Sequence, residues 1–439
     1  MSEPTSGPEI AFAGADISRR DFLQGSSAIA AAFGVSLGAA AEAQQAREAS
    51  ARDARPVNCA FIGVGSQGTS DLKHALSIPG VRFVALCDVY EPNLRRALEL
   101  APGAVGYSDY RKLLERKDIE LVFNATPLYV HAPVVIHSLQ AGKHVFSEKM
   151  MAYSIDDAKR MARASLDAKR ILQIGHQRRS NLIYNHGWEL INKGKVLGQL
   201  THIRAQWNRN GSWRRPVPKD TTDRHWNWRL YREYSQGLMA ELGTHQIHVA
   251  NWYLGAAPTA VVGMGGTDYW KDGRTVTDNV MVIFEYPGGV RFSYTSLTTN
   301  QYDGFYEQFM GKNGTLIVSQ ETGGQYYREP TAQSEDWMKN SATHETGARG
   351  QQGLKLDPEA TKKLGTTGQK VGEKTLTGSV AGKDDYLLQF EDLLASVRTG
   401  APVSCDWRDG LRACVSAIRA NEAIAKKTRI EIPPSDYLL

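Results

Sequence analysis

The stretch Val57-Asn58-Cys59-Ala60-Phe61-Ile62-Gly63-Val64-Gly65-Ser66-Gln67-Gly68 decides the fold of this chain. Its first half is apolar enough for a buried strand, and its second half is the pattern G-x-G-x-x-G at the start of a helical pattern. Such a loop turns tightly at its first glycine, lets a phosphate approach the second and packs helix against strand at the third. Helix-start N–H groups then face the anion. The stretch predicts a dinucleotide site at Gly63, Gly65, Ser66, Gln67 and Gly68. The alternative is an ordinary strand-to-helix turn whose glycines only relieve steric crowding.

A second apolar run, residues 81–87, ends at Asp88. Asp88 follows Gly68 by 20 residues, which is the offset of the acid that binds the adenosine ribose hydroxyls. The negative charge of this side chain disfavours a 2′-phosphate. The sequence therefore predicts NAD as the cofactor, with NADP less favoured.

Strand and helix patterns alternate from residue 57 to residue 175, which predicts a doubly wound parallel sheet. Helices are expected at 91–100, 109–114, 131–141 and 155–169, and further strands at 120–125, 144–147 and 171–175. Ligands of such sheets bind outside the carboxyl ends of the strands. The cofactor-binding residues expected there, besides Asp88, are Thr126, Pro127, His131, Glu148 and Lys149.

The pattern changes after residue 176. A helix is expected near 182–192, and long alternating runs at 199–207, 260–266, 276–286, 290–299, 306–311 and 315–319 predict a large, open, mostly antiparallel sheet. Residues 320–380 are rich in Gly, Thr, Lys and Gln, and are expected to form a long surface excursion. Helices at 384–398 and 409–426 end the chain. The predicted fold is α/β, with a Rossmann domain at 56–177 and a second α/β domain at 178–439 that binds substrate and forms oligomers.

The N-terminal region reads as an export signal. Ser18-Arg19-Arg20-Asp21-Phe22-Leu23 is a twin-arginine pattern, and a weakly apolar run of small residues follows it. That run is too short and too weakly apolar for a membrane span. We expect a twin-arginine signal at 1–43, an N-terminal arm at 44–55, a periplasmic location and no stable membrane insertion. The alternative is a disordered Ala-rich tail.

Composition excludes several classes of partner and site. The 439-residue chain has a net charge of +5, part of it within the expected signal, so no nucleic-acid partner is expected. Its four cysteines show no C-x-x-C spacing, so neither a zinc site nor a disulfide framework is expected.

Four motifs together carry a family resemblance: the loop Gly63 to Gly68, Ala125-Thr126-Pro127, Ser147-Glu148-Lys149 and Glu241-Leu242-Gly243-Thr244-His245. In order and spacing the chain resembles the Gfo/Idh/MocA family of glucose-fructose oxidoreductase and inositol dehydrogenase, from about residue 57 to about 427. The resemblance implies an NAD-dependent oxidoreductase with a C-terminal sheet that often forms a homo-oligomer interface, and an arm at 44–55 that covers the cofactor. Two positions depart from the family pattern: Met150 replaces a proline, and Glu241 replaces an aspartate.

The expected catalytic residues are Lys149, His245 and Glu241. Oxidation of a carbinol needs a hydride acceptor and a group that takes the hydroxyl proton. Lys149 is expected to bond the substrate oxygen, His245 to act as the base, and Glu241 to orient His245 or stabilise its charge. The spacing of Glu241, His245 and His248 also allows a metal site, but hydride transfer needs no metal, and none is expected.

The segment 207–234 is dense in Trp, Tyr and Arg, and its aromatic rings can stack on sugar faces. The candidate substrate contacts are Arg178, Trp213 and Tyr234; core and interface packing is the alternative for each aromatic residue. Two functions remain open. One is an exported NAD-dependent oxidoreductase that acts on a sugar or polyol. The other is an NAD-dependent glycosidase that oxidises a sugar carbon, eliminates the aglycone, adds water and reduces the ketone again.

Overall fold

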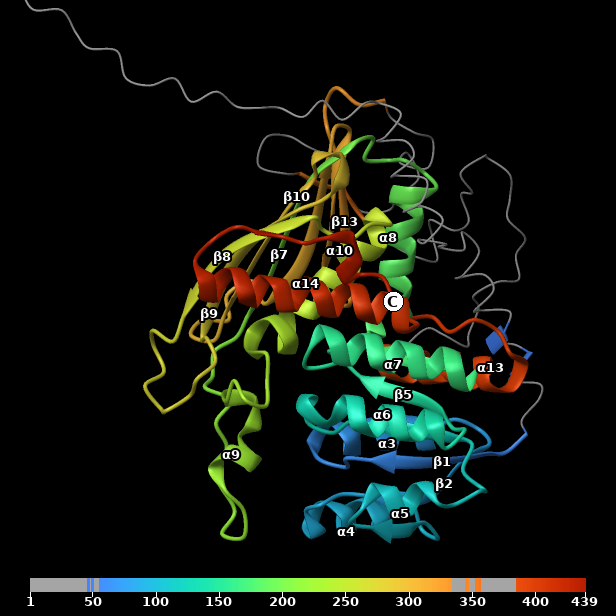
Figure 1. Ribbon diagram of the computed structural model, residues 1–439. Coiled ribbons are helices and arrows are strands. Elements are labelled where there is room, and N and C mark those ends of the chain that lie inside the picture. Colours follow the sequence, from blue (N-terminus) through green and yellow to red (C-terminus); the bar gives the residue numbers. More distant parts are fainter. Residues whose placement is uncertain (1–45, 48, 51–54, 334–343, 347–351, 357–383) are drawn as a thin grey trace, which may run out of the picture. The chain divides into compact units, whose positions relative to one another are not determined.

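The computed structural model describes residues 46–47, 49–50, 55–333, 344–346, 352–356 and 384–439. The expected export signal lies outside these residues. The described residues all belong to one compact unit. Within it, an N-terminal sheet and a C-terminal sheet stand on either side of a layer of helices (Figure 1).

The N-terminal sheet has six parallel strands in the order β3-β2-β1-β4-β5-β6. Both faces are covered, which explains why these strands read as unbroken apolar runs. The strands are β1 Val57–Ile62, β2 Val81–Cys87, β3 Val105–Tyr107, β4 Leu121–Asn124, β5 His144–Glu148 and β6 Leu172–Gly175. The predicted doubly wound sheet is confirmed. The sequence pattern does not predict the short edge strand β3.

Helices α3 Ser66–Leu76, α4 Glu91–Leu100, α5 Tyr110–Leu114, α6 His131–Gln140 and α7 Ile155–Ala168 connect these strands. A further helix, α13 (Asp385–Thr399), comes from the far end of the chain and packs on the same sheet. The ring of Phe390 meets those of Phe123 and Phe146 edge-on, with centroid distances of 5.4 and 5.0 Å. The core of the N-terminal sheet is therefore completed by a C-terminal helix.

The C-terminal sheet has ten described strands in the order β14-β15-β13-β12-β11-β7-β10-β9-β8-β16. Its pairs are antiparallel except the central pair β7 and β10, which run parallel. The strands are β7 Leu200–Asn208, β8 Ala260–Gly266, β9 Asn279–Glu285, β10 Arg291–Leu297, β11 Phe305–Gly311, β12 Gly314–Ser319, β13 Gly323–Arg328, β14 His344–Thr346, β15 Gln352–Lys355 and β16 Ile430–Glu431. The predicted large, mostly antiparallel sheet is confirmed.

One face of this sheet is covered by helices α8 Leu182–Asn192, α10 Thr244–Leu254 and α14 Trp407–Lys426. Helix α14 contacts α7, α10 and β8, and it crosses between the two sheets in Figure 1. Asp406 caps α14, accepting hydrogen bonds from the N–H groups of Arg408 and Asp409. Short turns are η1 Leu128–Val130, η2 Gln177–Arg179, α9 Asp223–Trp226, η3 Trp228–Leu230, η4 Met239–Gly243 (π-helical), η5 Pro287–Gly289 and η6 Pro434–Asp436.

The expected surface excursion at 320–380 is wrong for its described part, which contains β13, β14 and β15. The two glycines at the start of β13 favour a loop in the sequence pattern, but Gly324 is needed for close packing. A Cβ at Gly324 would lie 2.7 Å from Leu356 and 3.1 Å from Ile183 of α8. The remainder of 320–380 lies outside the described residues.

The described residues of the arm at 44–55 lie at the amino ends of the parallel strands, whereas a cofactor is expected at the carboxyl ends. Arg398 donates to the hydroxyl of Ser50 and to the carbonyl of Pro79, which precedes β2. Arg55 pairs with Glu120, which precedes β4, at 2.8 Å. These contacts are at the amino ends of the strands. The expectation that the arm covers the cofactor is therefore wrong for these residues.

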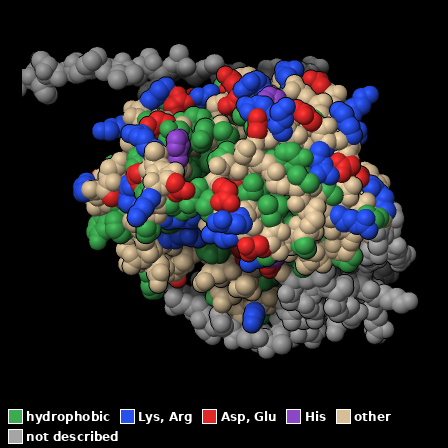
Figure 2. All heavy atoms as spheres, turned by 90° about the horizontal axis from the view of Figure 1, so that it is seen from below, with side chains coloured by type: hydrophobic (Ala, Val, Ile, Leu, Met, Phe, Trp, Pro, Cys, Tyr) green, Lys and Arg blue, Asp and Glu red, His purple; other side chains and the backbone are tan. Residues whose placement is uncertain are grey.

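The surface carries charges of both signs. On the face shown in Figure 2, Lys and Arg side chains alternate with Asp and Glu side chains. Among the described residues, no helix is both long enough and apolar enough to cross a membrane.

Candidate active site

A cavity of 590 Å³ lies at the carboxyl ends of the parallel strands and is closed on its other side by C-terminal residues. Most predicted site residues that lie beyond the glycine loop meet here. From the N-terminal half, the cavity is lined by Gln67, Thr126, His131, Glu148 and Lys149, and from the C-terminal half by Trp213, Glu241 and His245. One cavity therefore joins both halves of the predicted site.

The glycine loop has the geometry that a dinucleotide needs. Gly63 has a φ of +86°, and a Cβ there would lie 2.8 Å from the amide of Thr126. A Cβ at Gly68 would lie 2.0 Å from the carbonyl oxygen of Gly63, so only glycine lets α3 pack this closely. Gly65 instead faces open space, with Asn93 Nδ2 at 3.9 Å as the nearest atom to a Cβ built there. No side chain caps α3, which leaves its first N–H groups for a phosphate.

Asp88 lies at the end of β2, beside this loop. Its carboxylate accepts hydrogen bonds from the amides of Val64 and Tyr90, at 2.9 and 2.8 Å. Each oxygen retains capacity to accept a further bond, as a ribose diol requires. Burial raises the pKa of Asp88 above its ordinary value, although these hydrogen bonds oppose the shift. The loop and Asp88 together fit an NAD molecule.

His131 links two strand ends. Its Nδ1 lies 3.0 Å from the carbonyl oxygen of Met150, and its Nε2 lies 2.9 Å from that of Thr126. Pro127 stands directly before turn η1, between Thr126 and His131. Burial lowers the pKa of His131, so the ring is neutral at neutral pH and donates to one carbonyl at a time. His131 thus lies between the backbone segments that follow β4 and β5.

Lys149 directly follows β5, and its side chain reaches across the cavity. Its Nζ donates a 2.9 Å hydrogen bond to the backbone carbonyl of Glu241 in η4. The carboxylate of Glu241 accepts instead from Nε of Arg229, at 3.0 Å. Glu241 therefore positions Lys149 through its backbone, and the expectation that its carboxylate orients His245 is wrong. The π-helical turn between the two residues breaks the i,i+4 geometry on which that expectation rested.

His245 is buried, but its ring lines the cavity beside Trp207, with ring centroids 5.3 Å apart. Its Nδ1 has no hydrogen-bond partner among the described residues. Burial, followed by the positive charge of Lys149, lowers the pKa of His245 well below the ordinary value of 6.5. The imidazole is therefore neutral at neutral pH, which is the state that accepts a proton.

Two of the three predicted substrate contacts do not line the cavity. Arg178 is 1% exposed, and its guanidinium pairs with Glu307 and Glu321. Tyr234 does not line the cavity, and its ring packs against that of Tyr129 at a tilt of 52°. Arg178 thus neutralises the buried Glu307 behind the wall and Glu321 in the wall, and of these three residues only Trp213 lines the cavity.

The cavity wall also contains residues that were not predicted, among them Arg209, Arg215 and Tyr386. Arg215 donates a 3.0 Å hydrogen bond to the hydroxyl of Ser66 in the glycine loop. Arg209 and Arg215 belong to the Trp- and Arg-rich segment 207–234, so the high content of these residues in the segment could have pointed to both. Tyr386 comes from α13, and no local pattern points to it.

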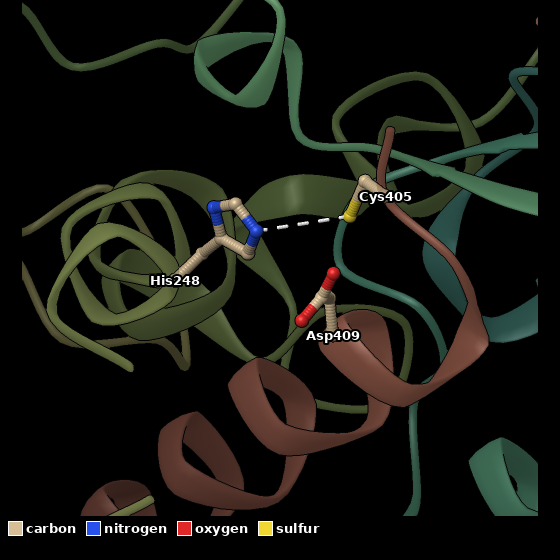
Figure 3. A group of neighbouring side chains, drawn as sticks. All are labelled: His248, Cys405 and Asp409. Carbon is tan, nitrogen blue, oxygen red and sulfur yellow. Dashed lines mark hydrogen bonds between the residues drawn. The ribbon is translucent and has the colours of Figure 1, made fainter. Parts of the chain in front are cut away.

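A second cluster includes His248, which follows His245 by three residues in α10. Figure 3 shows His248, Cys405 and Asp409 as neighbours. One ligand atom from each lies within 4.8 Å of the others, and this is the one such group found among the described residues. His248 Nε2 lies 3.7 Å from the sulfur of Cys405, while its Nδ1 has no partner there. Metal-bound histidines usually hold a partner at the second nitrogen. The trio weighed from the sequence, Glu241, His245 and His248, does not form such a group, and we assign no metal to either set.

Comparison with protein-family models gives two adjoining matches. Residues 57–176 match the Gfo/Idh/MocA model "Oxidoreductase family, NAD-binding Rossmann fold", and residues 189–432 match "Oxidoreductase family, C-terminal alpha/beta domain". The chain belongs to the Gfo/Idh/MocA oxidoreductase family. Its N-terminal half is the NAD-binding Rossmann domain of that family.

Curated Gfo/Idh/MocA relatives match over part of their length. Inositol 2-dehydrogenase of Salmonella paratyphi B is 30% identical over 198 residues, which is 44% of this chain and 53% of that protein. A glycosyl hydrolase family 109 protein of Shewanella baltica is 28% identical over 188 residues, which is 40% of this chain and 39% of that protein. These matches span about half or less of the relatives' length.

Solved structures share the fold over most of the chain. Levoglucosan dehydrogenase in complex with NADH and levoglucosan superposes with a TM-score of 0.69 at 18% identity, covering 86% of this chain and 100% of that chain. Aldose-aldose oxidoreductase of Caulobacter crescentus gives a TM-score of 0.66 at 20% identity, again covering 86% and 100%. At this identity the likeness describes the fold alone.

Proposed function

We propose that this Gfo/Idh/MocA protein is an exported oxidoreductase that transfers hydride between a carbinol of a sugar or polyol and a tightly bound NAD. The observation that carries the proposal is the single cavity in which Lys149, at a strand end of the NAD-binding domain, faces Glu241 and His245. The names of relatives and fold neighbours, which include inositol, levoglucosan and aldose enzymes, support a polyhydroxylated substrate.

The residues divide the chemistry between them. NAD, when bound, accepts the hydride from the carbinol carbon. Lys149 then donates to the substrate oxygen in place of the carbonyl of Glu241, and His245 takes the hydroxyl proton. Glu241 keeps Lys149 pointed into the cavity, and Arg229 neutralises its carboxylate. Trp213 and Trp207 flank the space and exclude water from the carbinol.

A redox-neutral glycosidase is the second candidate, supported by the family 109 relative. Aryl glycosides, incubated with the purified protein and no added cofactor, separate the two functions. Release of the phenol requires the glycosidase cycle, whereas an oxidoreductase leaves the aryl glycoside bond intact. A protein that neither releases phenol nor reduces its bound nucleotide with any of a panel of sugars and polyols would contradict both candidates.

Contacts over the nucleotide site support the proposed retention of NAD. Segment 213–234 of the C-terminal half crosses to the N-terminal half, where Arg215 bonds Ser66. Tyr90, two residues after Asp88, bonds Asp220 at 3.4 Å and meets the ring of Trp226 at 5.3 Å. A dinucleotide held by Asp88 and the loop would be enclosed on this side. The test is extensive dialysis of the purified protein, followed by denaturation and mass spectrometry of the released nucleotide. Near-stoichiometric NAD supports retention, and nucleotide-free protein that needs millimolar NAD contradicts it.

Export rests on the twin arginines Arg19 and Arg20. The periplasm holds no large pool of free NAD, so a retained cofactor that is reoxidised in place suits an exported enzyme. Replacing both arginines by lysine should leave the protein in the cytoplasm, as measured by fractionation. Unchanged periplasmic recovery would contradict this route.

A homo-oligomer through the C-terminal sheet is the assembly we propose. On its outer face Val262 opposes Ile283, and Met264 opposes Met281, so four apolar side chains form one patch on β8 and β9. Met264 and Met281 are 79% and 61% exposed. An apolar patch of this kind fits a second copy of the same sheet. Met281→Lys should shift the molar mass measured by light scattering toward the monomer, and a wild-type monomer would contradict the proposal.

A further inference from the structure

The charges that line the cavity do not cancel among the described residues. Five cationic side chains line it, and three acidic ones: Lys149, Arg209, Arg214, Arg215, Arg229, Glu148, Glu241 and Glu321. Arg229 pairs with Glu241 at 3.0 Å. Arg214 pairs with Asp223 at 2.6 Å, and Glu321 pairs with Arg178 at 2.8 Å. Neither of these outside partners lines the cavity.

Three cations and one acid remain after these pairs are removed. The acid is Glu148, and burial raises its pKa to about 7, so it carries only part of a negative charge at neutral pH. Two of the cations already have a place in the proposed reaction. Lys149 faces the carbinol oxygen, and Arg215 lies on Ser66, where the pyrophosphate of NAD binds. The third cation, Arg209, has no role in the proposed reaction so far.

Arg209 directly follows β7, and two indole rings hold its guanidinium in the cavity wall. The guanidinium carbon lies 5.4 Å from the ring centroid of Trp207 and 5.9 Å from that of Trp213. Trp207 in turn lies against His245. Arg209 forms no ion pair within the described part of the chain. An oriented guanidinium is thus available close to the reacting groups.

We propose that Arg209 binds a carboxylate of the substrate, so that the enzyme acts on an acidic sugar of the uronate class. This proposal rests on the proposed function and names its substrate class. A guanidinium presents two parallel N–H donors to a carboxylate, and a planar carboxylate matches this fork better than a hydroxyl does. Stacking on two indoles limits the rotamers of Arg209, so less side-chain entropy is lost when the anion binds.

The test is calorimetric binding to the NAD-loaded protein, which needs no turnover. The probes are matched pairs of methyl hexopyranosides and methyl hexopyranosiduronates in the gluco, galacto and manno series, together with the corresponding 6-phosphates. We expect one uronate to bind at least about tenfold more tightly than its neutral partner, a difference of ~1.4 kcal/mol. The preference should shrink as salt is added, because the site opens to solvent.

Substitutions test whether Arg209 causes the preference for the uronate. Arg209→Met should bind both members of the pair equally, and Arg209→Lys should keep only part of the preference because the fork is lost. Arg163→Met removes the same charge from the exposed side of α7 and should change nothing. Equal binding of each pair by the wild type, no binding of any uronate at millimolar concentration, tighter binding of the 6-phosphate, or an unchanged preference in Arg209→Met would each overturn the proposal. A uronate that binds with this preference but is never oxidised would overturn the proposed function instead.

Discussion

The Nζ of Lys149 lies 2.9 Å from the backbone carbonyl oxygen of Glu241, a residue 92 positions later in the chain. This hydrogen bond spans the cavity from the end of β5 to the turn η4. A backbone carbonyl keeps its place when side chains titrate, so the ammonium group is aimed without forming an ion pair. It is then free to exchange this acceptor for a substrate oxygen.

Lys149→Met and His245→Ala should each lower turnover on the order of 10²-fold, because each removes a group that assists proton movement in the transition state. NAD content after dialysis should stay near that of the wild type, since neither side chain belongs to the glycine loop. Turnover and nucleotide content are measured on the same preparation with the identified substrate. Near-normal turnover in either variant would remove that residue from the mechanism.

Substitutions of the second and third glycines of the loop should have different effects. Gly68→Ala places a methyl group 2.0 Å from the carbonyl of Gly63, so the nucleotide-free protein should lose roughly 1–3 kcal/mol of its free energy of unfolding. Gly65→Ala meets open space in the folded protein, so its unfolding free energy should change little while NAD binding is lost. Denaturant titration and NAD titration measure the two effects. Equal NAD affinity in Gly65→Ala and wild type would show that no phosphate approaches there.

Asp88→Ser should weaken NAD binding about 10- to 100-fold, the range expected when hydrogen bonds to a charged acceptor are lost. Affinity for NADP should change less, because the repulsion of the 2′-phosphate disappears with the carboxylate. Glu115→Gln removes an exposed acid of the same domain and serves as the control. Comparable affinity of the wild type for NAD and NADP would contradict the assigned role.

Glu148 should make stability depend on pH in a definite direction. Burial raises the pKa of this carboxyl from 4.5 to about 7 in the folded state. Between these values the folded protein binds more protons at Glu148 than the unfolded chain does, so its contribution to stability falls as pH rises. Wild type should therefore lose unfolding free energy relative to Glu148→Gln across this window, and the difference should level off above about pH 7. Parallel stability curves for the two proteins would contradict the buried ionisation.

Local sequence predicts the nucleotide half well because each of its signals is local. The glycine loop, Asp88 and the strand ends at Thr126 and Lys149 need only a buried strand and the rule that ligands bind at carboxyl ends. The helix at His131 and the strand that ends at Glu148 lie within a few residues of their predicted bounds.

The missed features depend on distant partners. Arg178 reads as a free cation after a strand, but Glu307 and Glu321 surround it in the fold. Glu241 pairs with Arg229 because the π-helical turn η4 redirects its side chain. Strand β13 begins with two glycines, and only the packing of Gly324 against α8 explains them. Each of these contacts joins residues from different elements or loops, so the pattern of no single helix or strand contains it.

Helix α13 also sets the order in which the protein can mature during translation. The ribosome completes the six parallel strands by residue 175, yet Phe390, Leu393 and Leu394 belong to the same apolar core as Phe123 and Phe146. Those aromatic rings stay open to water until the last tenth or so of the chain emerges. The nucleotide-binding domain is therefore synthesised first, but its apolar core is completed only when α13 has been synthesised.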